Sequence, residues 1–289
     1  MRYNLLIING AKMQLKVKSS NTDLKTFLSD NINISRSKAK ELIDSRQVFV
    51  NNQRAWIATY KLKKGDIVDV PDIIEAGKTY NVDIIYEDSY VIAINKPSGL
   101  IIDEKNNDFE NVLKNAVNCP GLRVVHRLDK ETTGVLLFAK NNEIFDKFKN
   151  LWQEKKVGKV YCAICLNEAD FDKKEIKKKI DGKEAESIIE TIASSNGVSC
   201  FKITTKTGRK HQIRIHLAHI GYPILGDKLY GPKIIKQNKF KKIAGHLLHS
   251  YELSYNCPWT NKEVKIKAPL PDEFFYFRDI SDVLRHKFR

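Results

Sequence analysis

Cysteine is scarce in this sequence of 289 residues. Its five cysteines are Cys119, Cys162, Cys165, Cys200 and Cys257. A small, odd number argues against a disulfide framework and for a reducing compartment. Cys162 and Cys165 have the spacing of a zinc or redox pair, but they lie in the apolar segment 160–166, for which we expect a buried strand. We therefore interpret both as core residues.

Long apolar runs are also missing. The longest, such as residues 135–139, are far shorter than the roughly 20 residues that a membrane-spanning helix needs. The N-terminal residues lack the basic start, long apolar run and small-residue cleavage site of a secretory signal. We therefore expect a cytoplasmic location and no membrane partner, and we further expect a monomer.

Cofactor motifs are absent as well. The sequence contains neither the Gly-x-Gly-x-x-Gly motif that binds dinucleotides nor a phosphate-binding loop. His211, His216 and His219 lack the spacing of a His-Glu-x-x-His zinc site and have no carboxylate ligand pattern near them. We expect neither a metal nor a small-molecule cofactor.

Acidic residues are outnumbered by basic ones. Lys and Arg number 50 against 35 Asp and Glu, so the formal net charge is +15. This excess favours a polyanionic partner, because basic side chains displace counterions from phosphates. Charge alone leaves RNA, DNA and an anionic membrane open, together with a lysine surplus that only aids solubility.

The first 70 residues contain the pattern of a small helical unit with short strands. Leu24, Phe27 and Leu28 have helical spacing behind Thr22, a candidate N-cap. A second helix is expected from Ser35, with apolar residues on one side. Strands are expected at 48–50, before the turn at 51–52, and at 67–70. The basic residues in and after the second helix are Arg36, Lys38, Lys40 and Arg46.

Residues 21–70 resemble an S4 domain, an RNA-binding module. The resemblance rests on the helix pair and on the segments 47–52 and 64–66, whereas residues 21–24 depart from the usual Arg-Leu-Asp pattern. It implies that Arg36, Lys38, Lys40 and Arg46 bind structured RNA. The alternative is a small α/β unit with a solvated basic face.

The rest of the chain predicts a second domain. Residues 71–81 contain proline, glycine and charge without a period, which is typical of a linker. Strands at 82–86 and 90–94 and a helix at 144–152 follow. We predict an α+β protein with an S4-like domain at 1–70, a linker at 71–81, and a catalytic domain with a mixed or antiparallel sheet at 82–289.

Two polar segments of this second domain carry candidate chemistry. Residues 126–134 place Asp129 in a loop just before the apolar strand 135–139, where a nucleophile or base can be held firmly and stay accessible. Asp129 could also cap a turn or pair with Arg127. Tyr161, in the next strand, is a packing ring or a proton-transfer group. The turn at 95–100 is expected to shape a loop beside the site.

The second polar segment is 207–216, followed by 221–231. Ile213, Leu217 and Ile220 have helical spacing, so Arg214 is expected on a helix with a buried stripe. An arginine there can form a bidentate pair with a carboxylate and keep it ionised.

Together, 123–134 and 208–216 with the sequel 221–227 resemble the RluA-type pseudouridine synthases, which convert uridine in RNA to its C-glycoside isomer. The resemblance extends over about 21–271. It implies that Asp129 is the catalytic carboxylate, that Tyr161 packs on the uracil and takes part in removing its C5 proton, and that Arg214 pairs with Asp129. It further implies that Arg127 fills the gap left by the flipped nucleotide and that Leu248 forms an apolar wall.

The same motifs provide further candidates for RNA binding, namely His126, Arg209, His211 and Gln212. S4-bearing members of the family act mostly on large-subunit ribosomal RNA, which is the expected substrate, with transfer RNA as the alternative. A non-catalytic RNA-binding or ribosome-assembly factor is a further alternative. An aspartate-dependent hydrolase would need a second carboxylate or a metal at fixed spacing, and the sequence offers no such pattern.

Overall fold

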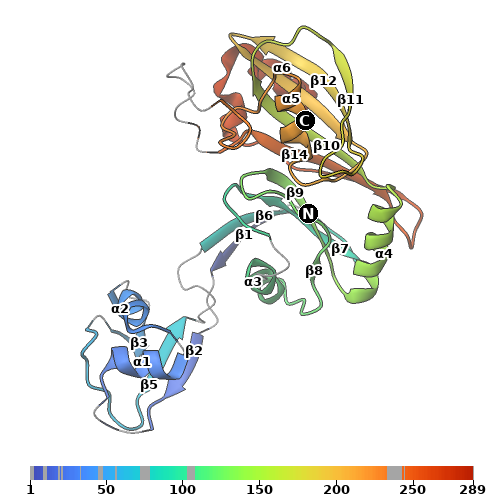
Figure 1. Cartoon of the computed structure of the whole chain (residues 1–289). Helices are drawn as coiled ribbons and strands as arrows, with labels where there is room; N and C mark the ends of the chain where they lie inside the picture. Colours follow the sequence, from blue (N-terminus) through green and yellow to red (C-terminus); the bar gives the residue numbers. More distant parts are fainter. Residues whose placement is uncertain are drawn as a thin grey trace. The chain divides into compact units, whose positions relative to one another are not determined.

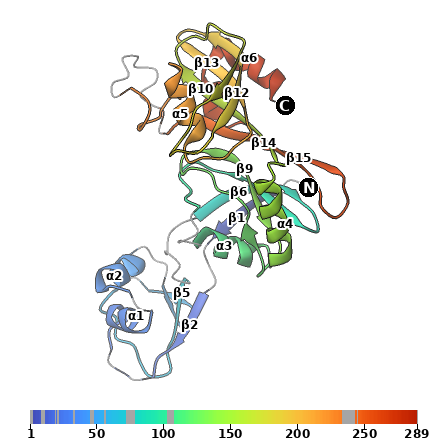
Figure 2. The same cartoon turned by 45° about the vertical axis from the view of Figure 1, so that its right-hand side comes forward.

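The computed structural model describes residues 3–8, 12–18, 20, 22–32, 34–44, 48–55, 57–71, 79–102, 108–232, 243 and 245–288. The chain divides into two compact units, one of Leu6–Tyr80 and one that combines Met1–Leu5 with Asn81–Arg289. Each unit contains helices and strands, which confirms the α+β class (Figures 1 and 2). Within the described ranges, no helix is long and apolar enough to cross a membrane.

The smaller unit combines two helices with a four-stranded sheet in one core. Leu28 of the first helix, Ile43 of the second and Val68 of the sheet are fully buried in this core. The helices and strands agree with the predicted pattern, and the strand order is β2-β5-β3-β4. The elements are β2 (Lys12–Lys16), α1 (Leu24–Ile32), α2 (Arg36–Asp44), β3 (Phe49–Val50), β4 (Gln53–Arg54) and β5 (Ile67–Pro71).

Two local features fix the ends of these elements. The predicted cap Thr22 is wrong, because Asp23 Oδ1 accepts the backbone N–H of Thr26 at 2.9 Å. An aspartate at this position also complements the positive end of the helix dipole. The predicted turn at Asn51 and Asn52 is confirmed, and both residues have positive φ, 50° and 63°, as a two-residue hairpin turn requires.

The structure adds detail at the two ends of the predicted S4-like domain, 1–70, and of the linker, 71–81. β1 (Tyr3–Ile8) is the neighbour of β6 (Thr79–Glu87) in the eleven-stranded sheet, and the division between the two units falls within β1, between Leu5 and Leu6. Residues 79–81 of the predicted linker belong to β6, while 72–78 lie outside the described residues. A strand partner more than 70 residues away leaves no local sequence signal.

The larger unit is built on one mixed sheet. Its order is β1-β6-β7-β9-β14-β10-β13-β12-β11, with β8 paired to β9 and β15 to β14. The further elements are β7 (Val91–Lys96), α3 (Asp108–Ala116), β8 (Arg123–Val124), β9 (Thr133–Ala139), α4 (Asn142–Gln153), β10 (Gly158–Leu166), β11 (Lys173–Lys177), β12 (Glu186–Ser195), β13 (Val198–Thr205), α5 (Gln212–His219), β14 (Leu248–Asn256), β15 (Glu263–Lys267), a 3-10 helix (Asp272–Tyr276) and α6 (Arg278–Lys287).

The middle of this sheet is a short parallel pair between β9 and β14. Thr133 lies opposite His249 and Gly134 opposite Ser250. Gly134 has φ +106°, and a Cβ atom there would lie 2.2 Å from the carbonyl oxygen of Ser250. The two backbones therefore meet at a distance that only glycine permits. The loop that carries Asp129 enters the sheet at this point.

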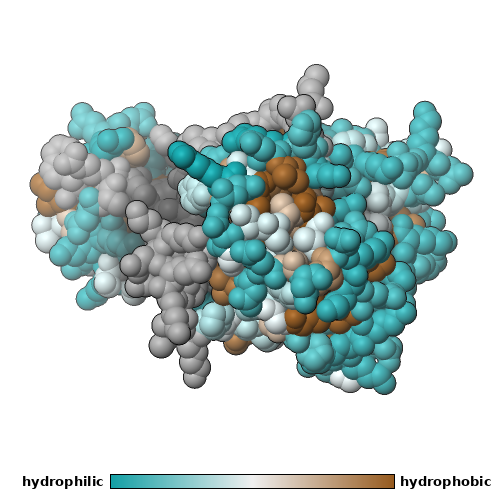
Figure 3. Space-filling view, turned by 90° about the horizontal axis from the view of Figure 1, so that it is seen from above, coloured by the Kyte–Doolittle hydropathy of each residue, from teal (hydrophilic) through white to brown (hydrophobic). Residues whose placement is uncertain are grey.

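The buried cysteines confirm the prediction for the segment 160–166. Cys162, Cys165 and Cys200 are fully buried on β10 and β13, and all five cysteines are free. Seen from above, the surface is mainly hydrophilic, with hydrophobic residues gathered in smaller areas (Figure 3). This distribution agrees with the high charge of the chain.

Candidate active site

The loop between β8 and β9 is held by a buried lysine. Lys96, the last residue of β7, is fully buried, and its Nζ donates to the carbonyl oxygens of Pro97, Lys130 and Thr132 at 3.0, 2.9 and 2.8 Å. Burial lowers the pKa of Lys96 to about 7, whereas the charge of Asp129 favours the ammonium form. The side chain of Lys96 thus fixes the backbone on the C-terminal side of Asp129. The sequence placed Lys96 in the turn at 95–100 but did not predict this role.

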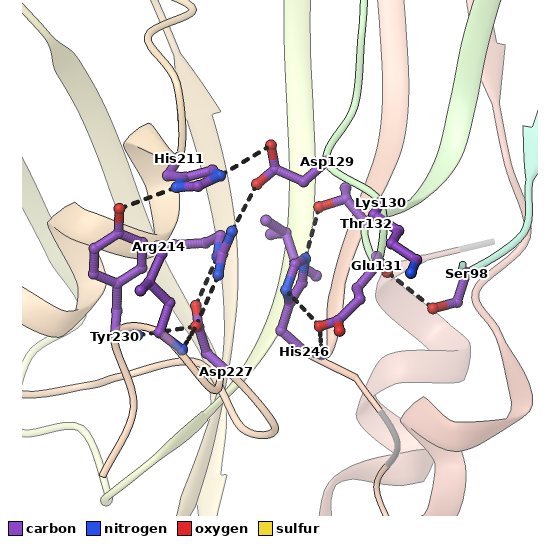
Figure 4. Close-up of polar contacts among 12 residues, drawn as sticks. Ser98, Asp129, Lys130, Glu131, Thr132, His211, Arg214, Asp227, Tyr230 and His246 are labelled. Carbon is purple, nitrogen blue, oxygen red and sulfur yellow. Dashed lines mark hydrogen bonds and ion pairs between the residues drawn. The ribbon is translucent and has the colours of Figure 1, made fainter. Parts of the chain in front are cut away.

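Two histidines hold the same loop from its other side. His246 Nε2 lies 2.8 Å from the hydroxyl of Thr132, and its backbone N–H donates to Glu131 (Figure 4). His249 Nδ1 lies 2.7 Å from the hydroxyl of Thr133. Burial lowers the pKa of His249 to about 4, so the ring is neutral. Because Nε2 donates to the carbonyl oxygen of Ala268 at 3.2 Å, Nδ1 accepts a hydrogen bond from the hydroxyl of Thr133.

Asp129 belongs to a carboxylate–arginine–carboxylate cluster (Figure 4). Arg214 Nη1 donates to Asp129 Oδ2 at 3.1 Å, while Nε and Nη2 donate to Asp227 at 2.7 and 2.9 Å. The bidentate pair predicted for Arg214 is therefore made with Asp227, and Asp129 receives a single N–H. Asp227 also accepts the backbone N–H groups of Leu229 and Tyr230.

The charges in this cluster sustain one another. Burial alone would raise the pKa of Asp227, but the hydrogen bonds and charge of Arg214 outweigh it and lower that pKa. Burial likewise opposes the charge on Arg214, yet Asp227 and Asp129 raise its pKa above the ordinary value. One guanidinium thus faces two carboxylates, and the ionised cluster has a net charge of about −1.

Tyr161 on β10 lies in the same cavity as Asp129. Burial, followed by the negative charge of Asp129, raises the pKa of Tyr161 to about 12, against a smaller lowering by the hydrogen bond with Ser250. The register between β10 and β14 shifts between Val160 and Tyr161, and such an irregularity changes the direction of a side chain. At neutral pH the site therefore contains a protonated phenol.

The cavity has a volume of about 230 Å³ and contains most of the predicted residues of the catalytic domain. Its wall combines a carboxylate, cations, an aromatic ring and an apolar side chain. The predicted residues that line it are Arg127, Asp129, Tyr161, Arg209, His211, Gln212, Arg214 and Leu248.

Three of the residues predicted to bind RNA have contacts within the protein. Gln212 is buried, and its amide contacts Thr207, Ser187 and two backbone groups, so it shapes the loop before α5. His126 Nε2 accepts the N–H of Leu137, and burial lowers its pKa to about 3, so it cannot bind a phosphate as a cation. Arg209 is exposed, although its Nε donates to the carbonyl of Glu184.

His211 lies between the cluster and Tyr230. Its backbone is left-handed, with φ 55°, at the start of α5. Nδ1 lies 3.0 Å from the hydroxyl of Tyr230 and Nε2 lies 3.7 Å from Asp129 Oδ1. Burial lowers the pKa of His211, so at neutral pH it is an uncharged neighbour of Asp129.

The basic residues that are predicted to bind RNA in the S4-like domain belong to the smaller unit and do not line this cavity. Arg36, Lys38 and Lys40 are on α2 of the smaller unit, with Arg36 and Lys40 exposed. Arg46 lies outside the described residues. Among the residues that the structure describes, no group of three or more His, Cys, Asp or Glu side chains is placed to share a metal ion.

Comparisons with known proteins identify the family. Residues 90–219 match the model for RNA pseudouridylate synthase and 24–68 the model for the S4 domain. Ribosomal large subunit pseudouridine synthase C of Buchnera aphidicola subsp. Schizaphis graminum is 32% identical, covering 91% of this chain and 94% of that protein. The chain therefore belongs to the RNA pseudouridylate synthase family, with an N-terminal S4 domain, and is an RNA-modifying isomerase.

Two further proteins agree with this assignment. Ribosomal large subunit pseudouridine synthase D of Pseudomonas aeruginosa is 30% identical, covering 68% of this chain and 70% of that protein. The solved structure of human RNA Pseudouridylate Synthase Domain Containing 4 has a TM-score of 0.56 at 23% identity, covering 70% of this chain and 91% of that one. The latter supports the fold.

Proposed function

We propose that this chain converts specific uridines of large-subunit ribosomal RNA to pseudouridine, with Asp129 as the catalytic carboxylate. The observation that carries the assignment of Asp129 is its place in the 230 Å³ cavity, paired with Arg214. The two bacterial relatives are named for the large ribosomal subunit, which favours this RNA over transfer RNA.

The reaction breaks the bond between N1 of uracil and C1′ of ribose and forms a bond between C5 and C1′. The C5 proton leaves and N1 gains a proton, so no atom or electron is lost overall. In the proposed mechanism Asp129 attacks either the sugar or the base, which frees the uracil to turn. Arg214 orients the carboxylate of Asp129 through one N–H, while its other two donors are held by Asp227.

An internal uridine must leave its stack before it can react, and this extrusion costs a few kcal/mol. We propose that Arg127, an exposed residue at the rim of the cavity, fills the space that the nucleotide leaves. The ring of Tyr161 then stacks on the uracil and Leu248 contacts its other surface. Tyr161 also takes part in moving the C5 proton.

All proposed catalytic groups come from one chain, so we also propose that the protein acts as a monomer, in the cytoplasm, without a cofactor. The basic residues Arg36 and Lys40 on α2, with Lys38 and Arg46, are proposed to bind the RNA around the target.

The test is to map pseudouridines in the RNA of the source organism with and without this protein. Loss of one or more pseudouridines from large-subunit ribosomal RNA, restored by the wild-type chain but not by Asp129→Asn, supports the proposal. Loss of pseudouridines from transfer RNA instead would identify transfer RNA as the substrate. An unchanged map would favour the non-catalytic RNA-binding or assembly factor.

A further inference from the structure

A second cavity adjoins the active site. It has a volume of about 450 Å³ and shares Arg127, Tyr161 and Gly208 with the cavity of Asp129. The rest of its wall comes from α3, β8, α4 and Lys159 of β10, together with the loop residues Ile102, Val125 and His126. All of these belong to the larger unit (Figure 1). The space is within the range of small-molecule pockets and is too large for a packing defect.

The aromatic surfaces of this cavity are preorganised. The guanidinium of Arg123 lies 3.8 Å from the centroid of the Phe145 ring. Trp152 stacks on His126 with ring centroids 5.1 Å apart. The rings of Phe145 and Trp152 are only partly buried, although both lie against the core. Aromatic rings and guanidinium planes are the surfaces on which proteins stack unpaired RNA bases.

The charged groups of the cavity are mostly cations. Arg123, Arg127, Lys149 and Lys159 line it, against one acid, Glu110. The carboxylate of Glu110 is already bonded to the backbone N–H of β8 at Val124 and to Lys114 on its own helix, each at 2.8 Å. The wall therefore has an excess of positive charge, which suits a phosphate.

Lys159 of β10 is a partly buried cation of this cavity with few contacts inside the protein. Among the described residues, its Nζ makes one long hydrogen bond, 3.4 Å to the carbonyl of Thr207. Burial, followed by the charge of Lys155, lowers its pKa. A phosphate beside it would restore the interactions that its ammonium group lost on leaving water.

We infer that this cavity binds a nucleotide next to the target uridine in the same RNA strand, with its base against Trp152 and Arg123 and its phosphate at Lys149 and Lys159. Neighbouring nucleotides share one phosphate, so a strand that places uracil against Tyr161 must place its next residue within reach of the adjoining space. The inference rests on the proposed function and deepens it, because the cavity would contribute to the choice of sequence around the uridine.

The test uses the full-length protein with Asp129→Asn, so that RNA is bound without being converted. Stem-loops that together cover large-subunit ribosomal RNA are screened for binding, and the tightest is used as the probe. Each loop nucleotide is then replaced in turn by an abasic one. The Kd of every RNA is measured with and without Arg123→Ala, a change at an exposed side chain.

We expect Arg123→Ala to weaken binding of the natural stem-loop about tenfold, and to have no effect when one loop nucleotide is abasic, because the stacked base is then missing. That nucleotide should lie within about two positions of the uridine that the wild-type protein converts. Equal weakening on the natural and on every abasic RNA would overturn the inference.

A pair of lysines on α4 provides the matched control. Lys149 lines the cavity, whereas Lys147 is exposed and does not line it. Lys149→Ala should weaken binding about threefold or more, and Lys147→Ala less than about twofold, since only the former removes a phosphate contact. Equal effects of Lys149→Ala and Lys147→Ala would contradict the inference. This control does not depend on Phe145, whose ring lies against Arg123 and could shift in Arg123→Ala.

The proposed function can fail separately. Conversion of the stem-loop by the wild-type protein is measured in parallel. If the effect of Arg123→Ala depends on one loop nucleotide but the RNA is not converted, the inferred nucleotide site is supported and the proposed function is rejected for this RNA. If the RNA is converted but the effect of Arg123→Ala depends on no loop nucleotide, the proposed function is supported and the inferred nucleotide site is rejected.

Discussion

At the residue scale, the orientation of Asp129 depends on Arg214 and Asp227. Arg214 donates to it once and to Asp227 twice, so the arginine is oriented by the second carboxylate and presents its remaining N–H to the first. Arg214 thus binds Oδ2 of Asp129, and among the described residues the neutral ring of His211 lies 3.7 Å from Oδ1. Replacement of single atoms in this cluster is therefore informative.

Asp129→Asn keeps the shape of the side chain and removes its charge. We expect the rate of pseudouridine formation to fall by about 10⁴-fold or more, because an amide is a poor nucleophile, while RNA affinity stays within about threefold. Single-turnover conversion and filter binding measure the two effects. Asp146→Asn, at an exposed carboxylate of α4, is the control. Activity in the Asp129 variant would refute its role.

Tyr161→Phe separates stacking from proton transfer. The ring remains, so RNA binding should be retained, while conversion should slow by about 10²-fold. Because the pKa of Tyr161 is raised to about 12, its ionised fraction grows with pH. The wild-type rate should therefore rise from about pH 7 to about pH 9, and the rise should be missing in the variant. Parallel pH profiles would show that the phenol takes no part in proton transfer.

The sequence could predict Asp129 and Arg214 because they lie in the two quoted motifs, and Tyr161 because the resemblance assigns a role to the tyrosine of the strand at 160–166. The structure brings all three together. Asp227 was within reach of the same reasoning, since an arginine on a buried helix requires a carboxylate and Asp227 ends the sequel 221–227. Lys96 had a weaker signal. It follows the apolar residues 91–94 of β7, where an exposed lysine at the strand end is the ordinary expectation.

At the element scale, the site depends on how β9 and β14 pair. Their parallel contact places Thr133 beside His249, residues more than 100 positions apart in the sequence. The apolar run at 135–139 predicted β9, whereas β14 was not predicted, and no local pattern specifies which strands become neighbours. The same limit applies to the pairing of β1 with β6.

His249 makes this pairing sensitive to acid. Its pKa is about 4 in the folded protein and about 6.5 when unfolded, so the unfolded state binds the extra proton between these values. Its contribution to stability is present above about pH 6.5 and is lost as the pH falls towards about 4. His249→Gln, which does not titrate, should reduce the decline of unfolding free energy over this window by about 2 kcal/mol. Denaturant unfolding at several pH values measures it, and an unchanged decline would contradict the assignment.

The basic side of α2 makes a prediction about salt. Removing Arg36 and Lys40 together should weaken RNA binding and reduce the slope of log affinity against log salt by about 2, since each phosphate contact contributes about one unit. The charge-matched control removes Lys147 and Lys287, exposed residues of α4 and α6. Substitution is preferable to deletion of the N-terminal segment, because β1 belongs to the sheet of the larger unit. An equal slope for both double variants would exclude α2 from RNA binding.

At the scale of the whole molecule, two separate cores predict two unfolding events. The helices of the smaller unit share one core with their own sheet, while the larger unit has several clusters around the long sheet. The length of the chain is typical of two domains. It does not show with which strand the N-terminal strand pairs.

Gly134→Ala should affect only the larger unit. The added Cβ would meet the backbone of Ser250, so we expect a loss of roughly 3 kcal/mol in the unfolding free energy of that unit, with the transition of the smaller unit unchanged. Gly182→Ala is the control, since it also has positive φ, +73°, but meets no atom within 4 Å. Its cost should be about 1 kcal/mol. Calorimetry distinguishes the two, and equal losses would mean that the close backbone approach is unimportant.

The ammonium group of Lys96 restricts how this enzyme can diversify. Because it binds the carbonyls of residues 97, 130 and 132 at once, an insertion or deletion next to Asp129 would remove the two acceptors that the loop provides, at residues 130 and 132, from a buried ammonium group. The catalytic loop can therefore change neither its length nor its path in small steps. New RNA targets must be acquired through surfaces that tolerate substitution, such as α2 and the walls of the second cavity. Attempts to redirect the enzyme to another uridine should accordingly begin there and leave the loop intact.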